Sequence, residues 1–378
     1  MQNSDRKKKE AFARKIGTIL NSGALNLAMG IGYRLGLFEA MDELGEPAGA
    51  DDIAARAGLN ERYVQEWLGV MACGGVVEIT TGQDGRELFL LPREHADVIT
   101  TRAGSANMGV YTQEIPLLTH LVFEDVLNSF QTGEGVSYNK YPRFYEFMGQ
   151  LAEAKHREVL LDSFLPAVDG GEMLKRLQAG IRVCDLGCAQ GTALLLMAEA
   201  FPHSQFVGID ISEKEIEAAR SRAGRLGNVS FEVQDAAEIN SSGEWAERFD
   251  YVTAFDAIHD QTRPLEALKG VVAMLKQGGS FSMVDIAASS RMAENCDHPM
   301  GPFLYTVSLM HCMPVGLVNG GTGLGMMWGR DKAVEMLKQA GFSRVEVQEL
   351  TDDPFNFHYF CNKDEAAARI QGSESRSH

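Results

Sequence analysis

The chain has 378 residues, of which 45% are hydrophobic and 23% charged, a composition typical of a globular protein with about two domains. Collagen, a simple coiled coil and a mainly disordered chain are excluded. The 35 basic and 52 acidic residues give a net charge of −17, which disfavours nucleic acid as the main partner.

The cysteines and the first uncharged run both favour a cytoplasmic protein. The six cysteines form no Cys-x-x-Cys pair, which is ordinary usage in a reducing compartment. The uncharged run at residues 16–33 contains polar residues and four glycines, so it is too polar to span a membrane. Its apolar residues recur at helical spacing, which predicts an amphipathic helix that packs within the fold or against a second subunit.

Residues 1–100 are expected to form a helical, winged-helix-like domain. Residues 50–57 and 60–73 read as helices, and each is followed by a glycine that ends it. Two β-rich runs, at residues 76–80 and 88–91, follow and are joined by a turn. Helix, turn, helix and hairpin in this order predict a winged helix.

The second of these helices has the wrong charge for a DNA-reading element. Between Glu61 and Cys73 it offers Arg62 against Glu61 and Glu66, so it nets negative. A helix in the major groove needs several cations for phosphates and base edges. We therefore expect no nucleic-acid partner, although a winged-helix regulator that senses its ligand and binds DNA stays open as the alternative to an enzyme.

The rest of the chain divides into three further parts. Residues 101–180 are expected to be a helical linker, and residues 364–378 a disordered tail. Between them, residues 181–363 alternate β-like runs with amphipathic helices, which predicts an α/β domain with a doubly wound parallel sheet. A long insertion at residues 287–329 interrupts the last helical unit and is expected to act as a lid.

A glycine-containing turn marks the expected ligand site. The strand at residues 181–185 runs into Gly187 to Gly191 and then into a helix, which places backbone N–H groups against a ligand. Asp210 ends the next strand, 23 residues after Gly187, where an acid accepts the hydroxyls of a ribose. Asp235 and Ala236 follow the third strand, where an adenine edge would lie.

Two ligand classes fit a glycine turn followed by such an acid. A dinucleotide favours Gly-x-Gly-x-x-Gly, but Ala189 and Thr192 stand at two of the three glycine positions. S-adenosylmethionine favours apolar-x-Asp-x-Gly-x-Gly-x-Gly, and the nine residues from Val183 to Gly191 satisfy this pattern except at Ala189. A dehydrogenase is therefore the weaker reading.

With these motifs, residues 181–363 resemble the class I S-adenosylmethionine-dependent methyltransferases, and the whole chain is similar to a narrower family that adds an N-terminal winged helix. The resemblance implies a seven-stranded Rossmann-like domain and transfer of a methyl group to a small-molecule acceptor by in-line displacement. A homodimer is expected by analogy with small-molecule O-methyltransferases. The implied cofactor-binding residues are Asp185, Gly187, Cys188, Ala189, Gly191, Asp210, Ile211, Asp235, Ala236 and Phe255.

The middle position of the turn departs from the family pattern. Glycine there tolerates a positive φ and lets the backbone approach the cofactor, whereas Ala189 pays a conformational cost. We expect the cofactor still to bind, but with a lower affinity than a glycine at this position would give.

His259 is the expected general base for an acceptor that arrives protonated. Residues just after the fourth strand face the ligand crevice of an open α/β sheet, and they include Asp256, His259 and Asp260. Imidazole titrates near neutral pH, and Asp256 or Asp260 is expected to orient it. The alternative without a catalytic role is that Asp256 or Asp260 caps the next helix and that His259 is a polar residue at the rim of the crevice.

The acceptor pocket is expected to include Tyr141, Phe144 and His311, although an aromatic stripe is more often core. The lid also contains Cys312, next to His311. Adjacent residues do not easily share one tetrahedral site, so no metal ion is expected.

Overall fold

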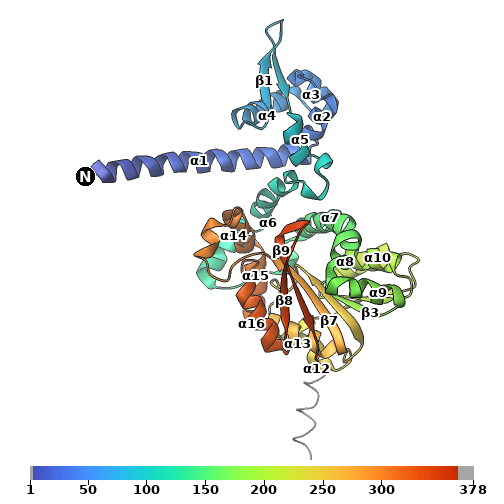
Figure 1. Cartoon of the computed structure of the whole chain (residues 1–378). Helices are drawn as coiled ribbons and strands as arrows, with labels where there is room; N and C mark the ends of the chain where they lie inside the picture. The colour runs from blue at the N-terminus through green and yellow to red at the C-terminus, as the bar shows by residue number, and fades with distance from the viewer. Residues whose placement is uncertain (1–2, 365–378) are drawn as a thin grey trace, which may run out of the picture. The chain divides into compact units, whose positions relative to one another are not determined.

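The computed structural model describes residues 3–364 and divides the chain into two compact units, one ending at His120 and the other beginning at Leu121 (Figure 1). Residues 365–378, which make up nearly all of the expected disordered tail, lie outside the described part.

The first unit is helical and carries one hairpin, as expected. The helix α4 begins after Asn60, whose side chain accepts a hydrogen bond from the N–H of Arg62 at 3.1 Å. The hairpin strands pair antiparallel, with Ile79 opposite Phe89. A buried core that includes Trp67 joins the helices to the hairpin. The elements are α1 (Asn3–Arg34), α2 (Leu37–Leu44), α3 (Ala50–Ala57), α4 (Glu61–Cys73), β1 (Glu78–Thr81), β2 (Glu87–Leu90) and α5 (Arg93–Ile99), followed by the short 3-10 segments η1 (Thr101–Ala106) and η2 (Gly109–Gln113).

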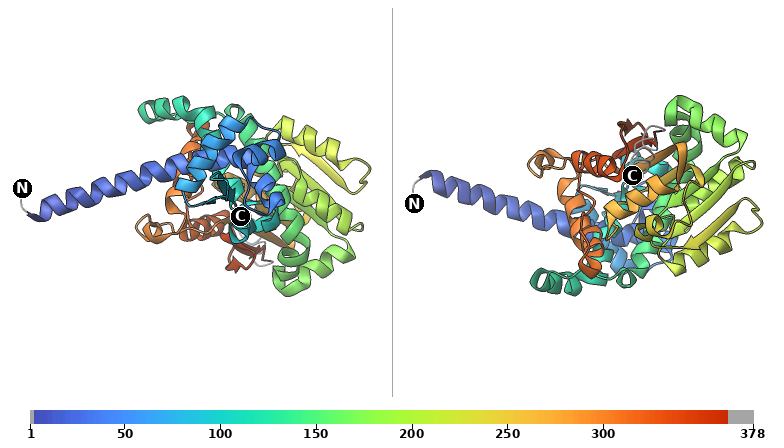
Figure 2. Two further views of the ribbon diagram at one scale, coloured as in Figure 1. Left: turned by 90° about the horizontal axis from the view of Figure 1, so that it is seen from above. Right: turned by 90° about the horizontal axis from the view of Figure 1, so that it is seen from below.

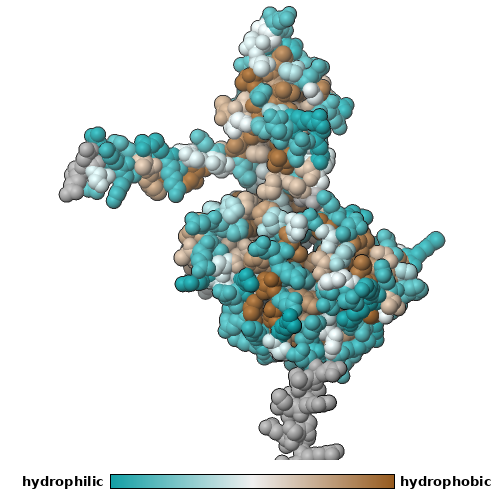
Figure 3. All heavy atoms as spheres, viewed as in Figure 1, coloured by the Kyte–Doolittle hydropathy of each residue, from teal (hydrophilic) through white to brown (hydrophobic). Residues whose placement is uncertain are grey.

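The helix α1 extends well beyond the other elements of its unit (Figures 1 and 2). Its C-terminal part is anchored, because the indole N–H of Trp67 donates to the carbonyl of Ala28 at 2.8 Å. Further toward the N-terminus, Phe12 is 62% exposed and Leu20 is 68% exposed. Hydrophobic patches therefore interrupt an otherwise polar surface along the helix (Figure 3).

The second unit is built on a seven-stranded sheet in the order β5-β4-β3-β6-β7-β9-β8. The first five of these strands run parallel, and β9 pairs antiparallel with both β7 and β8. The sheet therefore confirms the expected α/β class and the expected seven strands. Its strands are β3 (Arg182–Leu186), β4 (Gln205–Asp210), β5 (Val229–Val233), β6 (Phe249–Phe255), β7 (Leu275–Ile286), β8 (Val345–Leu350) and β9 (Asp353–Asn362).

Helices cover both faces of this sheet (Figure 1). The side chains of one strand alternate between two hydrophobic cores, as Val183 and Cys184 of β3 illustrate. One core includes α9, α10 and α11, and the other includes α13 and α16. The helices that form this unit with the sheet are α7 (Pro142–Val159), α8 (Leu165–Ala167), α9 (Glu172–Ala179), α10 (Thr192–Ala200), α11 (Glu213–Ala223), α12 (Ile239–Ser242), α13 (Pro264–Met274) and α16 (Arg330–Ala340), while α6 (Glu114–Thr132) crosses the boundary between the units.

The insertion at residues 287–329 forms two short helices, α14 (Gly301–Met310) and α15 (Cys312–Gly316). The backbone breaks between them at His311, which has φ −135° and ψ −76°. The carbonyl of Pro314 accepts the N–H of Val136 at 3.0 Å, so the insertion is tied to the segment before α7. Across the described residues, no helix is both long and apolar enough to span a bilayer.

Candidate active site

The turn between β3 and α10 lies at the carboxyl edge of the parallel strands. Gly187 and Gly191 have φ of 73° and 74°. A Cβ on Gly187 would lie 2.5 Å from the Cβ of Ala257, and one on Gly191 would lie 2.4 Å from the Phe231 ring. Both positions therefore need glycine for conformation and for space.

Ala189, which replaces the middle glycine, has a φ of 45°. A non-glycine residue pays roughly 1–2 kcal/mol for this left-handed conformation. Its N–H donates to Oδ2 of Asp210 at 2.9 Å, and the N–H of the buried Cys188 donates to the carbonyl of Ile209 at 3.1 Å. The turn thus has the strained backbone that the sequence predicts, and a carboxylate holds it.

Asp210 ends β4 with its carboxylate directed at the glycine turn. It is 8% exposed, and its Oδ1 accepts the N–H of Ser212 at 2.8 Å. Burial raises its pKa above the ordinary range for an aspartate. A carboxylate offers about four acceptor positions. Because two are used by Ala189 and Ser212, Asp210 retains capacity to accept two hydroxyl groups.

Asp185 supports the turn from behind. It is 4% exposed, and Thr253 donates to its Oδ1 at 2.7 Å. Burial is the main cause that raises its pKa to about 7, and the nearby charge of Asp210 acts in the same direction.

The remaining expected cofactor residues lie on the neighbouring strand ends. Asp235 accepts the N–H of Ala237 at 2.8 Å and pairs with Arg263 at 2.9 Å, so it begins the short turn after β5. Ala236 is buried beside it, whereas Ile211, after β4, is 63% exposed.

Phe255 ends β6 among other rings. Its centroid lies 4.9 Å from that of His156 on α7 and 5.5 Å from that of Phe164. Burial, with a smaller effect of Lys155, lowers the pKa of His156 to about 3. The expected cofactor residues therefore line the ends of four adjacent strands, β5, β4, β3 and β6.

His259 follows β6 and is 3% exposed. Its Nδ1 lies 2.7 Å from Oδ1 of Asp285, a fully buried carboxylate near the end of β7. The same oxygen accepts the indole N–H of Trp328 at 3.0 Å and the N–H of Ile286 at 2.8 Å. Burial alone would lower the pKa of His259, but the carboxylates of Asp285 and Asp260 outweigh it and hold this pKa well above its usual value.

Asp256 does not orient His259, contrary to one expectation from the sequence. It leaves β6 with a φ of 49°, and its carboxylate lies 3.8 Å from Nζ of Lys155 and 3.4 Å from Nδ2 of Asn356. No contact among the described residues joins it to His259 by a hydrogen bond. The left-handed backbone directs Asp256 toward α7 and β9, so the orienting carboxylate is Asp285.

Asp260 is close to the other imidazole nitrogen, with its Oδ1 3.4 Å from Nε2 of His259. Cys312 completes a group of three, whose ligand atoms all lie within 4.8 Å of one another. The adjacent His311 has its Nδ1 3.4 Å from the Cys312 sulfur. Burial raises the pKa of the Cys312 thiol to about 12 and lowers that of His311.

The three expected acceptor-pocket residues lie together in the structure. The rings of Tyr141 and Phe144 lie 4.9 and 4.6 Å from that of His311. Tyr141 is fully buried and donates to the carbonyl of Met310 at 2.9 Å, and Phe144 is 1% exposed. The less buried Tyr145 lies 3.3 Å from Nε2 of His311 and stacks on Tyr138.

Several buried acceptor oxygens at this edge of the sheet make no hydrogen bond within the described part of the chain. They belong to Asp256 (Oδ1), Asp260 (Oδ1), Asp285 (Oδ2) and Asn356 (Oδ1). Buried polar atoms in folded proteins are almost always satisfied. Their gathering at the carboxyl ends of β6, β7 and the start of β9 is therefore typical of a ligand site.

Sequence reasoning missed three residues of this arrangement. Asp285 was hidden in an apolar strand, and its only signal was an acid near the carboxyl end of a run that otherwise reads as core. Tyr145 and Cys312 were seen as part of an aromatic stripe and of the lid, and no spacing linked either to His259.

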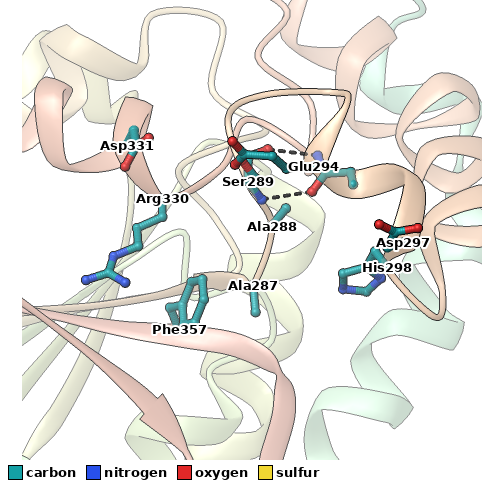
Figure 4. Close-up of a pocket in the computed structure, with 10 residues that line it drawn as sticks. Ala287, Ala288, Ser289, Glu294, Asp297, His298, Arg330, Asp331 and Phe357 are labelled. Atoms are coloured by element: carbon teal, nitrogen blue, oxygen red, sulfur yellow. Dashed lines mark hydrogen bonds between the residues drawn. The ribbon is translucent and has the colours of Figure 1, made fainter.

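A cavity of about 400 Å³ lies at the base of the insertion (Figure 4). Its walls include Ala287, Ser289, His298, Arg330 and Phe357. None of the cofactor, acceptor or catalytic residues expected from the sequence lines it.

Two family models match the chain in separate regions. Residues 177–348 match the model described as a methyltransferase domain, and residues 23–102 match the model described as an Rv2258c-like winged HTH domain.

The curated relatives align over part of their length. The 27-O-demethylrifamycin SV methyltransferase of Amycolatopsis mediterranei is 32% identical over 112 residues, which is 29% of this chain and 40% of that protein. The erythromycin 3''-O-methyltransferase of Saccharopolyspora erythraea is 27% identical over 183 residues, or 47% of this chain and 55% of that protein. The chain thus spans about half the length of these relatives.

Solved structures are similar over nearly the whole chain. Human N-acetylserotonin methyltransferase in complex with S-adenosylmethionine has a TM-score of 0.62 at 15% identity and covers 93% of this chain and 97% of its own. The mitomycin 7-O-methyltransferase MmcR has a TM-score of 0.62 at 17% identity, with 94% and 99% covered. At these identities the likeness establishes the fold.

Proposed function

We propose that this chain, which combines a methyltransferase domain with an N-terminal winged helix-turn-helix domain, transfers a methyl group from S-adenosylmethionine to a small-molecule acceptor by in-line displacement. The observation that carries the proposal is the carboxylate of Asp210, which faces the glycine turn at the carboxyl edge of the sheet. A nucleoside ligand of an open α/β sheet binds at this edge.

The residues present fit this cofactor. Asp210 has acceptor capacity for both ribose hydroxyls, while Gly187 and Gly191 keep the turn free of side chains. Asp235, Ala236 and Ile211 lie at the ends of the neighbouring strands, where we place the adenine, and Phe255 borders the same edge. When bound, S-adenosylmethionine supplies an electrophilic sulfonium methyl group, so the protein's task is to position the acceptor and exclude water.

We assign His259 as the general base: its Nε2 takes the proton from an acceptor that arrives protonated. Asp285 accepts the Nδ1–H, which orients the ring and stabilises the imidazolium formed. The carboxylates on either side increase the proton affinity of the imidazole, so His259 acts as a base only in the fraction of molecules in which it has lost its proton, a fraction that rises with pH. Asp256, with an unsatisfied oxygen at the same edge, is proposed to contact the reacting ligands rather than His259.

We place the acceptor beside His311, with Tyr141 and Phe144 as the buried support behind it. The insertion that carries His311 is proposed to cover the bound acceptor. The name of one relative, the erythromycin 3''-O-methyltransferase, supports transfer of the methyl group to an oxygen atom of the acceptor.

The DNA-binding regulator is not favoured by any observation. On α4, Arg62 is already paired with Glu66 at 2.5 Å, and the helix nets negative. We therefore propose no nucleic-acid partner.

A homodimer through α1 accounts for the exposed side chains of Phe12, Ile19 and Leu20. Light scattering of the wild type and of Leu20→Asp tests it: the variant is expected to halve the mass, whereas Tyr63→Asp, at an exposed site on α4, should not. Equal masses for wild type and Leu20→Asp would refute this interface. We propose a cytoplasmic location on the spacing of the six cysteines in the sequence, which form no Cys-x-x-Cys pair.

Calorimetry with S-adenosylmethionine and S-adenosylhomocysteine tests the central proposal. Folded protein that binds neither compound would refute it. Mass spectrometry of extracts incubated with the protein and a cofactor labelled in its methyl group then identifies the acceptor.

A further inference from the structure

We propose that His259, Asp260 and Cys312 form a binding site for a divalent transition-metal ion, with Zn²⁺ as the favoured ion. This inference concerns metal binding and does not depend on the proposed methyl transfer. A metal ion and a proton cannot both occupy Nε2 of His259, so His259 does not act as a base while the ion is bound.

The three side chains offer one ligand atom each, and these atoms all lie within 4.8 Å of one another. They come from two segments far apart in the sequence, the loop after β6 and the start of α15. Imidazole nitrogen, carboxylate oxygen and thiolate sulfur are the three ligand types that zinc takes in proteins. The group therefore brings three ligand types that suit zinc close together.

The spacing matches the coordination geometry of zinc. Bonds of about 2.0–2.1 Å to nitrogen and oxygen in a tetrahedral site place those two atoms about 3.3 Å apart. Nε2 of His259 and Oδ1 of Asp260 are 3.4 Å apart. The bond of about 2.3 Å to sulfur requires a slightly longer separation from each of them. The three ligand atoms lie within 4.8 Å of one another, so binding requires only small rotations of the side chains.

The surroundings of His259 are those of a metal ligand. A histidine that binds a metal ion usually donates its other ring N–H to a carboxylate, which fixes the tautomer. Nδ1 of His259 lies 2.7 Å from Asp285, and Asp285 is itself held by Trp328 and Ile286. Nε2 is the ring nitrogen that faces Asp260, and it binds the ion in exchange for its proton.

Of the adjacent pair His311 and Cys312, only Cys312 contributes a ligand atom, whereas the adjacent His259 and Asp260 both contribute, because Nε2 of His259 already lies 3.4 Å from Oδ1 of Asp260. The chain changes direction between α14 and α15. The His311 ring instead lies beside the sulfur, with Nδ1 at 3.4 Å, where its N–H can donate to a thiolate.

Burial and charge also suit a dication. His259 and Cys312 are each 3% exposed, while the Asp260 side chain is 24% exposed and offers an entry path. One carboxylate and one thiolate neutralise a divalent ion. With three protein ligands, the fourth position remains for water or for the acceptor.

Cobalt absorption and zinc competition with the full chain test the site. The metal-free protein is titrated with Co²⁺, and the thiolate-to-cobalt charge-transfer band and the tetrahedral visible bands are recorded. Zinc affinity is measured against a chromophoric chelator. We expect one Co²⁺ per chain with both sets of bands, and their loss when Zn²⁺ is added.

Two ligand variants and one control make the outcome decisive. Cys312→Ala should lose the charge-transfer band, and the partly exposed Asp260→Asn should weaken zinc binding. Asp285→Asn should lower zinc affinity about 10- to 100-fold through His259. Cys361→Ala, at a buried cysteine of β9 outside the group, should behave as wild type. Circular dichroism confirms that each variant is folded.

The proposal is overturned if the folded wild type shows no stoichiometric Co²⁺ binding, or if Cys312→Ala keeps the charge-transfer band. Calorimetry with S-adenosylmethionine on the same samples reports separately on the proposed function. Loss of the cofactor signal alone would leave the metal site standing.

Discussion

The substitution Asp210→Asn is the sharpest test of the cofactor site, because it removes a charge with little change of shape. In the structure the two carboxylate oxygens accept N–H groups from Ala189 and Ser212 at 2.9 and 2.8 Å. An asparagine keeps one acceptor oxygen and turns its NH₂ group toward one of these N–H donors. The side chain therefore cannot satisfy the turn and both ribose hydroxyls at once.

The expected loss follows from the hydrogen bonds involved. A hydrogen bond to a charged group contributes about 1.5–3 kcal/mol, so loss of one bond lowers the affinity for S-adenosylmethionine about 10- to 100-fold. Asp210→Ala removes both ribose bonds and should cost about 3–6 kcal/mol, which brings binding to the limit of detection.

Isothermal titration calorimetry with S-adenosylmethionine measures both effects. Asp250→Asn is the matched control: Asp250 also accepts a backbone N–H, that of Arg182 at 2.9 Å, but at the start of β6 rather than at the carboxyl edge. The control should keep wild-type affinity. If Asp210→Asn, folded as judged by its thermal transition, binds the cofactor as tightly as wild type, the ribose role is wrong.

Three further substitutions test the carboxylate that orients His259, the strained turn and the buried His156. Asp285→Asn is expected to lower kcat about 10²- to 10⁴-fold, with little change in cofactor affinity, because it misorients His259. Ala189→Gly should relieve roughly 1–2 kcal/mol of strain at φ 45°, but the more flexible unfolded chain offsets about 0.5–1 kcal/mol of this gain. The expected net stabilisation, measured by urea unfolding, is about 1 kcal/mol. His156 has its folded-state pKa lowered to about 3, so its contribution to stability is present above pH 6.5 and is lost as the pH falls. Between pH 6.5 and about pH 5 this loss amounts to about 2 kcal/mol in the wild type, and His156→Phe should lack it.

Each of these has an outcome that contradicts it. Unchanged turnover in Asp285→Asn, with the acceptor found by the labelled-methyl screen, would remove the proposed role of the pair. A less stable Ala189→Gly would mean that the turn is not strained. Parallel pH profiles of the free energy of unfolding for wild type and His156→Phe would show that the imidazole does not titrate as the burial implies.

The sequence alone determined the architecture and the glycine turn after β3, because both rest on local patterns. The alternation of strands and helices, the glycines at positions 187 and 191, and the acid at the end of the second strand are encoded within short windows. The strained φ at Ala189 was predictable for the same reason, since a turn of this kind requires a positive φ whatever surrounds it.

Only the tertiary structure decided which side chains meet at the carboxyl edge of the sheet. Asp285 lies 26 residues from His259 and Cys312 lies further still, and their approach depends on strand order and on the bend at His311. Asp256 stands three positions before His259, yet a left-handed backbone turns it away. Contacts between distant segments carry no spacing signal, so a carboxylate inside an apolar strand reads as core until the sheet brings it beside an imidazole.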